Sequence, residues 1–151
     1  MAHFMAPQPS AEGLPTFFNV DGVVGAAPAQ NLREDVLLVQ FFFSVIAKNV
    51  TDPAAKAVLG AVKVTGLIDA PTIAAIVDIQ TRHKKNNPGA IVDGRVSPAK
   101  AGYSYGTGHW AITRLNDNVQ AKQLDHWPRI DKIPGCPAEL KAMVVRVLVG
   151  T

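Results

Sequence analysis

The sequence predicts a mainly α fold for this chain of 151 residues. Apolar residues recur at helical spacing in three segments, which cover residues 31–48, 73–79 and 137–147. Each segment begins at a residue that commonly caps a helix or at a proline, which is tolerated in the first helical turn. Glycine- and proline-rich stretches separate the segments, so we expect helices joined by turns.

The composition is that of an ordinary soluble globular chain. Apolar residues make up 48% and charged residues 18%, and no apolar stretch is long enough to cross a membrane. The formal charge is only +3, and residues 82–85 form the one local basic cluster. Nucleic-acid binding normally needs a larger basic surface with interleaved aromatic residues, so we expect neither a membrane span nor a nucleic-acid partner.

Residues 1–30 are predicted to form an extended N-terminal arm, because they hold four of the eleven prolines and few charges. Within the arm, residues 17–25 could form a hairpin across Asp21 and Gly22. Two alternatives stay open for this apolar arm, which either packs on its own domain or docks to a partner.

The first residues lack the basic and apolar regions of a general secretory signal. The sequence therefore indicates synthesis in the cytoplasm. It leaves the final localisation unknown, with delivery to the periplasm or cell envelope by a dedicated machine as one route.

The first predicted helix covers residues 31–48, with Asn31 as its N-cap and Glu34 as the capping-box partner. Its apolar face is broad, which implies contacts on more than one side. The residues of this face are Leu38, Val39, Phe41, Phe42, Phe43, Val45 and Ile46.

A short helix is expected from Asp52 and Pro53 to about Val62. A glycine turn at Gly66 then leads into the next long helix, which Asp69 caps.

Leu67 and Ile68 follow this glycine and supply an apolar plug between turn and helix. The inward face of the helix is predicted to hold Ile73, Ile76, Val77 and Ile79.

A second glycine turn follows in residues 91–98, where Asp93 and Gly94 precede a single apolar residue and a Ser-Pro helix start. Beyond it, residues 99–108 are rich in tyrosine and glycine and predict a loop. A short helix is expected over residues 109–116, with residues 118–124 either extending it or beginning another. The final helix starts at Pro137, and its apolar stripe is Leu140, Met143, Val144 and Val147.

Together the two turns resemble the peptidoglycan-binding domain family. Its signature runs D-G-x-F-G-P-x-T-x-x-A-V-x-x-F-Q, followed by a short loop and V-D-G-x-V-G-P-x-T-W. The matching positions of the first half are Gly66, Ile68, Thr72, Ala75, Ile76 and Gln80, and those of the second are Val92, Asp93, Gly94, Val96 and Pro98. The family's opening helix, often D-V-x-x-V-Q, is matched by Asp35, Val36, Val39 and Gln40.

The resemblance covers residues 31–115, and the chain departs from the signature at several points. Thr65 stands where the family usually has Asp, and Asp69 stands where it has Gly. The loop after the second long helix is long and basic, and Trp110 matches the family's Trp only across an insertion.

The resemblance implies a small three-helix core in residues 31–116. Residues 1–30 then form the arm, and residues 117–151 form a C-terminal extension whose final helix packs on the core. The Tyr/Gly-rich loop is an insertion in this core. The implied function is non-catalytic binding of bacterial peptidoglycan, through its stem peptide, in a groove between the helices and the two turns.

The expected ligand-binding residues lie at the second turn and on the inserted loop. Arg95 and turn N–H groups would hold carboxylates and amides, while aromatic side chains would cover alkyl parts of the stem peptide. The alternative for single residues is that Trp110 belongs to the core and Asp93 only shapes its turn. The full set is Asp93, Arg95, Tyr103, Tyr105, His109 and Trp110.

No enzyme is predicted, and we expect no catalytic residues, metal or cofactor. The four histidines show no closely spaced ligand pair, and Cys136 is the only cysteine. Glycan cleavage would need two placed carboxylates, yet Glu34 and Glu139 both fall in first helical turns, where capping explains them.

A second function class stays open beside wall binding. The chain could be a structural or adaptor protein of a secretion or phage-tail assembly that uses the same fold for protein–protein contacts. Its partner would contact the N-terminal arm or the C-terminal helix.

Overall fold

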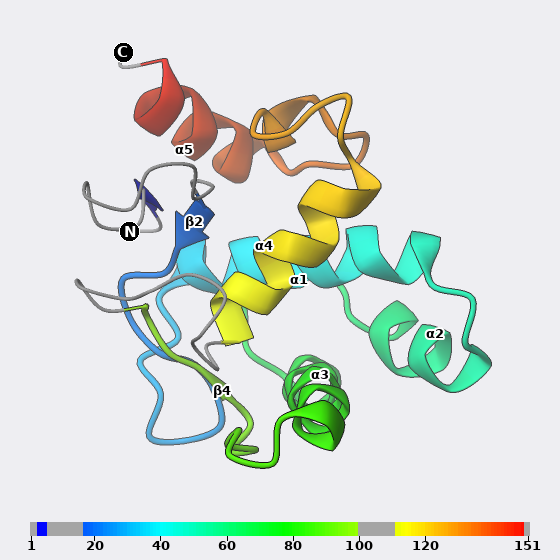
Figure 1. Ribbon diagram of the computed structural model, residues 1–151. Coiled ribbons are helices and arrows are strands. Elements are labelled where there is room, and N and C mark those ends of the chain that lie inside the picture. The colour runs from blue at the N-terminus through cyan, green and yellow to red at the C-terminus, as the bar shows by residue number, and fades with distance from the viewer. Residues whose placement is uncertain (1–2, 6–16, 100–110, 150–151) are drawn as a thin grey trace, which may run out of the picture.

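The computed structural model describes residues 3–5, 17–99 and 111–149, and the predicted mainly α fold is confirmed (Figure 1). The described residues hold five α-helices, which are α1 (Arg33–Asn49), α2 (Pro53–Gly60), α3 (Ala70–Asn86), α4 (Ala111–Lys122) and α5 (Ala138–Leu148). The other elements are a 3-10 helix, η1 (Ile130–Lys132), and the short strands β1 (His3–Met5), β2 (Phe17–Asn19), β3 (Val24–Gly25) and β4 (Arg95–Val96). Among these helices, none combines the length and the apolar character that crossing a membrane requires.

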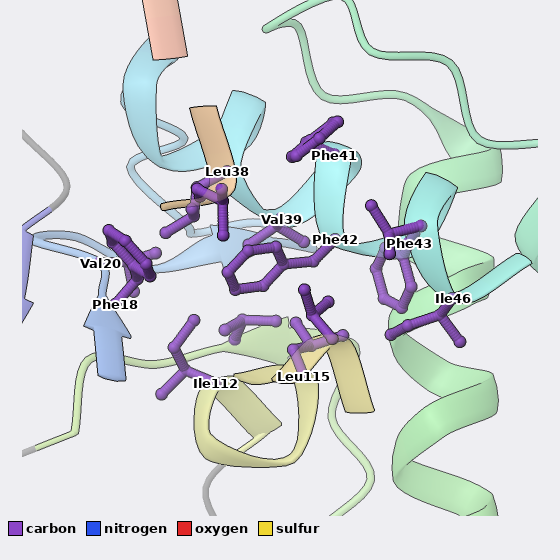
Figure 2. Packing of buried hydrophobic residues seen from close by; sticks show 14 of the residues in the cluster. Phe18, Val20, Leu38, Val39, Phe41, Phe42, Phe43, Ile46, Ile112 and Leu115 are labelled. Atoms are coloured by element: carbon purple, nitrogen blue, oxygen red, sulfur yellow. The ribbon is translucent and has the colours of Figure 1, made fainter. Parts of the chain in front are cut away.

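Helix α1 is the central element. Every residue from Asp35 to Phe43 is buried, as the broad apolar face predicted, because the other helices surround it. Helix α4 crosses in front of it in Figure 1, with α3 on one side and α5 on the other. In Figure 2, Ile112 and Leu115 of α4 point toward Phe42 and Val39 of α1. The main core is thus the contact between α1 and α4.

The start of α1 differs from the prediction, since Asn31 is not its N-cap. The helix begins at Arg33, and the cap residue Leu32 makes no side-chain capping bond. Asn31 has a positive φ of 51° and turns its amide back toward the preceding strand. Its Oδ1 accepts from Gly25 N at 2.8 Å, and its Nδ2 donates to Gly25 O at 3.1 Å. The side-chain amide of Asn31 is therefore bonded to the backbone N–H and C=O of Gly25, so it does not cap α1.

The predicted hairpin across Asp21 and Gly22 is also wrong. Strand β2 pairs with β1, and β3 pairs with β4, both antiparallel, so β2 and β3 do not pair with each other. The reason is the fully buried Asp35 of α1, whose carboxylate accepts the N–H groups of Asp21 and Gly22 at 2.9 to 3.2 Å. These bonds hold the turn against α1 and direct its two flanks to different sheets.

The end of the arm belongs to the domain's own core. Phe17, Phe18 and Val20 are fully buried. The ring of Phe18 meets Phe42 and Trp127 edge-on, with centroids 6.3 and 5.6 Å apart. Of the two alternatives for the arm, packing on its own domain therefore holds for residues 17–20.

The predicted caps of α2 and α3 are confirmed. Asp52 accepts from Ala55 N at 3.1 Å, and Asp69 accepts from Thr72 N at 2.9 Å, with a proline in each first turn.

Two predicted inward positions near α3 are wrong. Leu67 is 67% exposed, and only Ile68 packs partly on the core, so the apolar plug is a single residue. Val77 lies at the edge of the buried face and is 38% exposed, whereas Ala75 is buried.

Helix α5 packs on α1. Helix α4 runs to Lys122, so residues 118–122 extend it rather than begin another helix. In α5, Leu140, Met143 and Val144 are fully buried. Two ion pairs join its surface to the start of α1, Arg33–Glu139 at 2.7 Å and Arg146–Glu34 at 3.2 Å.

We expect Phe42→Ala to lower the free energy of unfolding by about 3–5 kcal/mol, because it leaves a cavity at the α1–α4 contact. Urea denaturation followed by circular dichroism measures the change. Leu124→Ala is the control, because Leu124 is 73% exposed and its truncation removes little burial. Equal losses for the two variants would show that this contact is not the core.

A pH-dependent stability follows from Asp117 of α4. Burial raises the pKa of this half-buried carboxyl from 3.8 to about 6. Because its pKa is raised, the folded state favours the protonated form of the Asp117 carboxyl. The stability that this carboxyl contributes is therefore fully present below its unfolded-state pKa and is lost as the pH rises through about 6.

Asp117→Asn should therefore stabilise the protein near pH 8 by about 1 kcal/mol, allowing for the half exposure of the group, and hardly at all near pH 4. Urea denaturation at both pH values tests this. An equal change in stability at the two pH values would contradict the role of Asp117.

Candidate functional site

The first glycine turn is held by one buried glutamine of α1. The Oε1 atom of Gln40 accepts from Thr65 N and Gly66 N, both at 2.9 Å. Its Nε2 atom donates to Leu67 O at 2.9 Å and to Thr72 Oγ1 at 3.1 Å. All the hydrogen-bonding capacity of this fully buried amide is thus used to join α1, the turn and the start of α3.

The second glycine turn repeats this arrangement one helix later. The Oε1 atom of Gln80 accepts from Asp93 N at 3.2 Å and from Gly94 N at 2.9 Å. Its Nε2 atom donates to Asp93 Oδ1 at 3.1 Å and to Arg95 O at 2.9 Å. We call these two arrangements the glutamine clasps.

Glycine is required in both clasps. Gly66 and Gly94 have φ values of +81° and +71°, a backbone conformation that residues with a Cβ rarely adopt. A Cβ on Gly66 would also lie 2.8 Å from Nη1 of Arg33. The two turns that the sequence pairs therefore share their backbone conformation and their mode of attachment to a helix.

The described members of the predicted ligand set, Asp93 and Arg95, lie in the second clasp. Asp93 Oδ1 accepts from Gln80 Nε2 and, at 3.0 Å, from Arg95 N. Arg95 Nη1 donates to Ala27 O at 3.3 Å. Both side chains help to shape the turn, about a third of each is exposed, and their role in ligand binding stays a prediction. The other predicted members lie outside the described residues, namely Tyr103, Tyr105, His109 and Trp110.

A groove with a cavity volume of about 490 Å³ lies between the C-terminal half of α1, α2, the C-terminal half of α3, and α4. Its floor is apolar and includes Phe43, Ile46 and Leu59, and its rim is polar. Neither glycine turn contributes to it. This groove is therefore not the predicted one between the helices and the two turns, which stays a prediction. We call it the helical groove.

Charged side chains line the helical groove on two walls. On the α2 and α3 side, Arg82 Nε lies 2.8 Å from Asp78 Oδ2, and Arg82 Nη2 lies 3.0 Å from Asp52 Oδ2. The hydrogen bond to Asp78 raises the pKa of Arg82 further above its ordinary value. On the α4 side are Arg114 and Lys122, which make no ion pair with any other described residue.

Four amide side chains complete the rim of the groove. Their carbonyl and amino groups match those of a peptide backbone, which makes the groove suited to a polar, peptide-like ligand. They are Asn49, Asn86, Asn87 and Asn118.

Sequence reasoning missed the groove because its walls come from four separate segments of the chain. The one available signal was the cluster Arg82–Lys85, whose Arg82 and His83 line the groove. By itself such a cluster at a helix end indicates only a solvated surface.

Outside the groove, the cysteine and the two glutamates that could have served in catalysis are buried or ion-paired within the fold. Burial raises the pKa of Cys136 to about 12, so it is a thiol at neutral pH. Glu34 and Glu139 pair with arginines across α1 and α5. Within residues 3–5, 17–99 and 111–149, no three histidine, cysteine, aspartate or glutamate side chains gather where they could hold a metal ion.

Comparisons with protein-family models, with curated proteins and with solved structures found no match to the chain.

The second clasp predicts the effect of Gln80→Glu. A carboxylate keeps the acceptors but loses the two donated bonds and places a negative charge beside Asp93, so we expect a loss of about 2–3 kcal/mol in the free energy of unfolding. The loss should shrink at acid pH, where a protonated carboxyl can again donate a bond. Urea denaturation at several pH values measures it. Gln120→Glu, on the half-exposed part of α4, is the control, and an equal loss there would contradict the role of the clasp.

Proposed function

We propose that the protein is a non-catalytic module that binds bacterial peptidoglycan through its stem peptide. The observation that carries the proposal is the repeated glutamine clasp. Gln40 and Gln80 occupy the signature's two glutamine positions, and each fastens one of the two glycine turns to its helix. The signature positions that the chain keeps are thus ones that contact each other in space, which supports the resemblance to the peptidoglycan-binding domain family.

The helical groove supports the same function. Its volume of about 490 Å³ lies in the range of small-ligand sites and accommodates a few peptide residues. Its apolar floor would pack against alkyl side chains, and its asparagines would bond the peptide backbone. Asp93 and Arg95 lie in the second clasp, outside the groove, and belong to the proposal as further contacts.

Exposed apolar side chains favour the second candidate, an adaptor that contacts another protein. Leu67 and Ile91 are about two-thirds exposed, and Val92 is 37% exposed. Exposed apolar side chains of this size are available for protein–protein contact. The adaptor would belong to a secretion or phage-tail assembly and would use the same fold.

Sedimentation with purified sacculi tests the proposal. The protein should be retained, and Asn118→Ala should reduce the bound fraction at subsaturating protein by up to about tenfold, because it removes one polar contact in the groove. Arg95→Ala and Tyr105→Ala test the surface that the sequence proposes. Gln123→Ala, which lies beyond the groove on the same segment, is the control.

Each other outcome has a defined meaning. Absence of retention, together with a stable complex with another protein, would replace wall binding by the adaptor function. Release of muropeptides from the sacculi would contradict a non-catalytic role.

A further inference from the structure

The formal charges of the helical groove are separated between its walls. The wall formed by α2 and α3 carries two carboxylates, Asp52 and Asp78, around the single guanidinium of Arg82. The opposite wall carries Arg114 and Lys122 of α4 and no carboxylate. One wall therefore has an excess of negative charge and the other an excess of positive charge.

The negative wall retains free acceptor capacity. Asp52 uses its Oδ2 atom for both Ala55 N and Arg82, and Asp78 uses its Oδ2 atom for Arg82. In the part of the chain that the structure describes, the Oδ1 atoms of both carboxylates accept no hydrogen bond. A carboxylate has about four acceptor positions, so each can also bind an ammonium group.

The positive wall is a linear array on one helix. Arg114, Asn118 and Lys122 are four residues apart, so they follow one face of α4 over about 12 Å. A guanidinium binds a carboxylate through two parallel N–H groups, and a lysine adds a second charge. Asn118 Nδ2 is used internally, on Arg114 O at 2.8 Å, which leaves its carbonyl oxygen for an N–H donor of a ligand.

We propose that the helical groove binds a zwitterionic peptide, with an amino group against Asp52 and Asp78 and a carboxylate against Arg114 and Lys122. This inference rests on the proposed function for its biological ligand, a stem peptide in which a diamino acid supplies the amino group. The charge separation fixes the direction in which the peptide lies across the groove. It also makes the groove selective against peptides whose carboxylate is amidated or whose amino group is acylated.

Three small peptides test this selectivity on the full chain. The probes are Nα-acetyl-Lys-Ala, its C-terminal amide, and its Nε-acetyl derivative, each titrated into ¹⁵N-labelled protein. We expect the first to shift the amide signals of Asn49, Asn86 and Asn118 saturably. The two blocked peptides should bind at least about fivefold more weakly, since each loses one charged contact.

Variants assign each charge to its wall. Arg114→Gln should abolish the preference for the acid over the amide but keep the preference for the free amine. Asp78→Asn should do the reverse. Lys63→Gln is the control, because Lys63 is exposed and lies outside the groove.

The outcomes separate this inference from the proposed function. Equal affinities for the three peptides, or no saturable shifts, would overturn the zwitterion site even if sacculi retain the protein. Selective binding without retention on sacculi would support the zwitterion site and would refute only its assignment to peptidoglycan.

Discussion

The structure depends on buried glutamine and asparagine side chains, whose amide groups form hydrogen bonds with backbone N–H and C=O groups in place of other backbone groups. Gln40 and Gln80 each satisfy two N–H groups and one carbonyl of a glycine turn. Asn116 satisfies one N–H group and one carbonyl of β2, since it accepts from Phe18 N and donates to Phe18 O. A buried backbone group without a partner costs free energy, and these irregular segments have few regular ladder partners to offer. The amides therefore allow a helical core to carry tight turns and two-residue strands.

This constraint explains why α1 is buried on all sides. Its apolar residues pack on α4 and α5, while Asp35 and Gln40 face turns that need acceptors or donors. A helix with a purely apolar surface could not have held those turns. The same division recurs in α3, where Ile76 faces the core and Gln80 faces the second turn.

The helical groove is a consequence of the same arrangement. Because the clasps fix the start of α3 to α1 and its middle to the second turn, the C-terminal half of α3 stands beside α2 and α4 with polar side chains between them. Arg82 and its two carboxylates lie on one wall of the groove, and the cations Arg114 and Lys122 of α4 lie on the other. The polar side chains on these walls are not part of the core, so they are available to bind a ligand.

The sequence by itself determined the helical class, the caps at Asp52 and Asp69, and the pairing of Gly66 with Gly94, because these depend on local spacing and on residues with strong backbone preferences. It did not determine the partners of Asn31 or of the Asp21–Gly22 turn. Local rules favoured a capping box and a hairpin there, yet contacts with Gly25 and with Asp35 are what form. Only the tertiary structure decided the groove, since Asp52, Arg82 and Lys122 become neighbours through packing of separate helices, and no spacing along the chain encodes that contact.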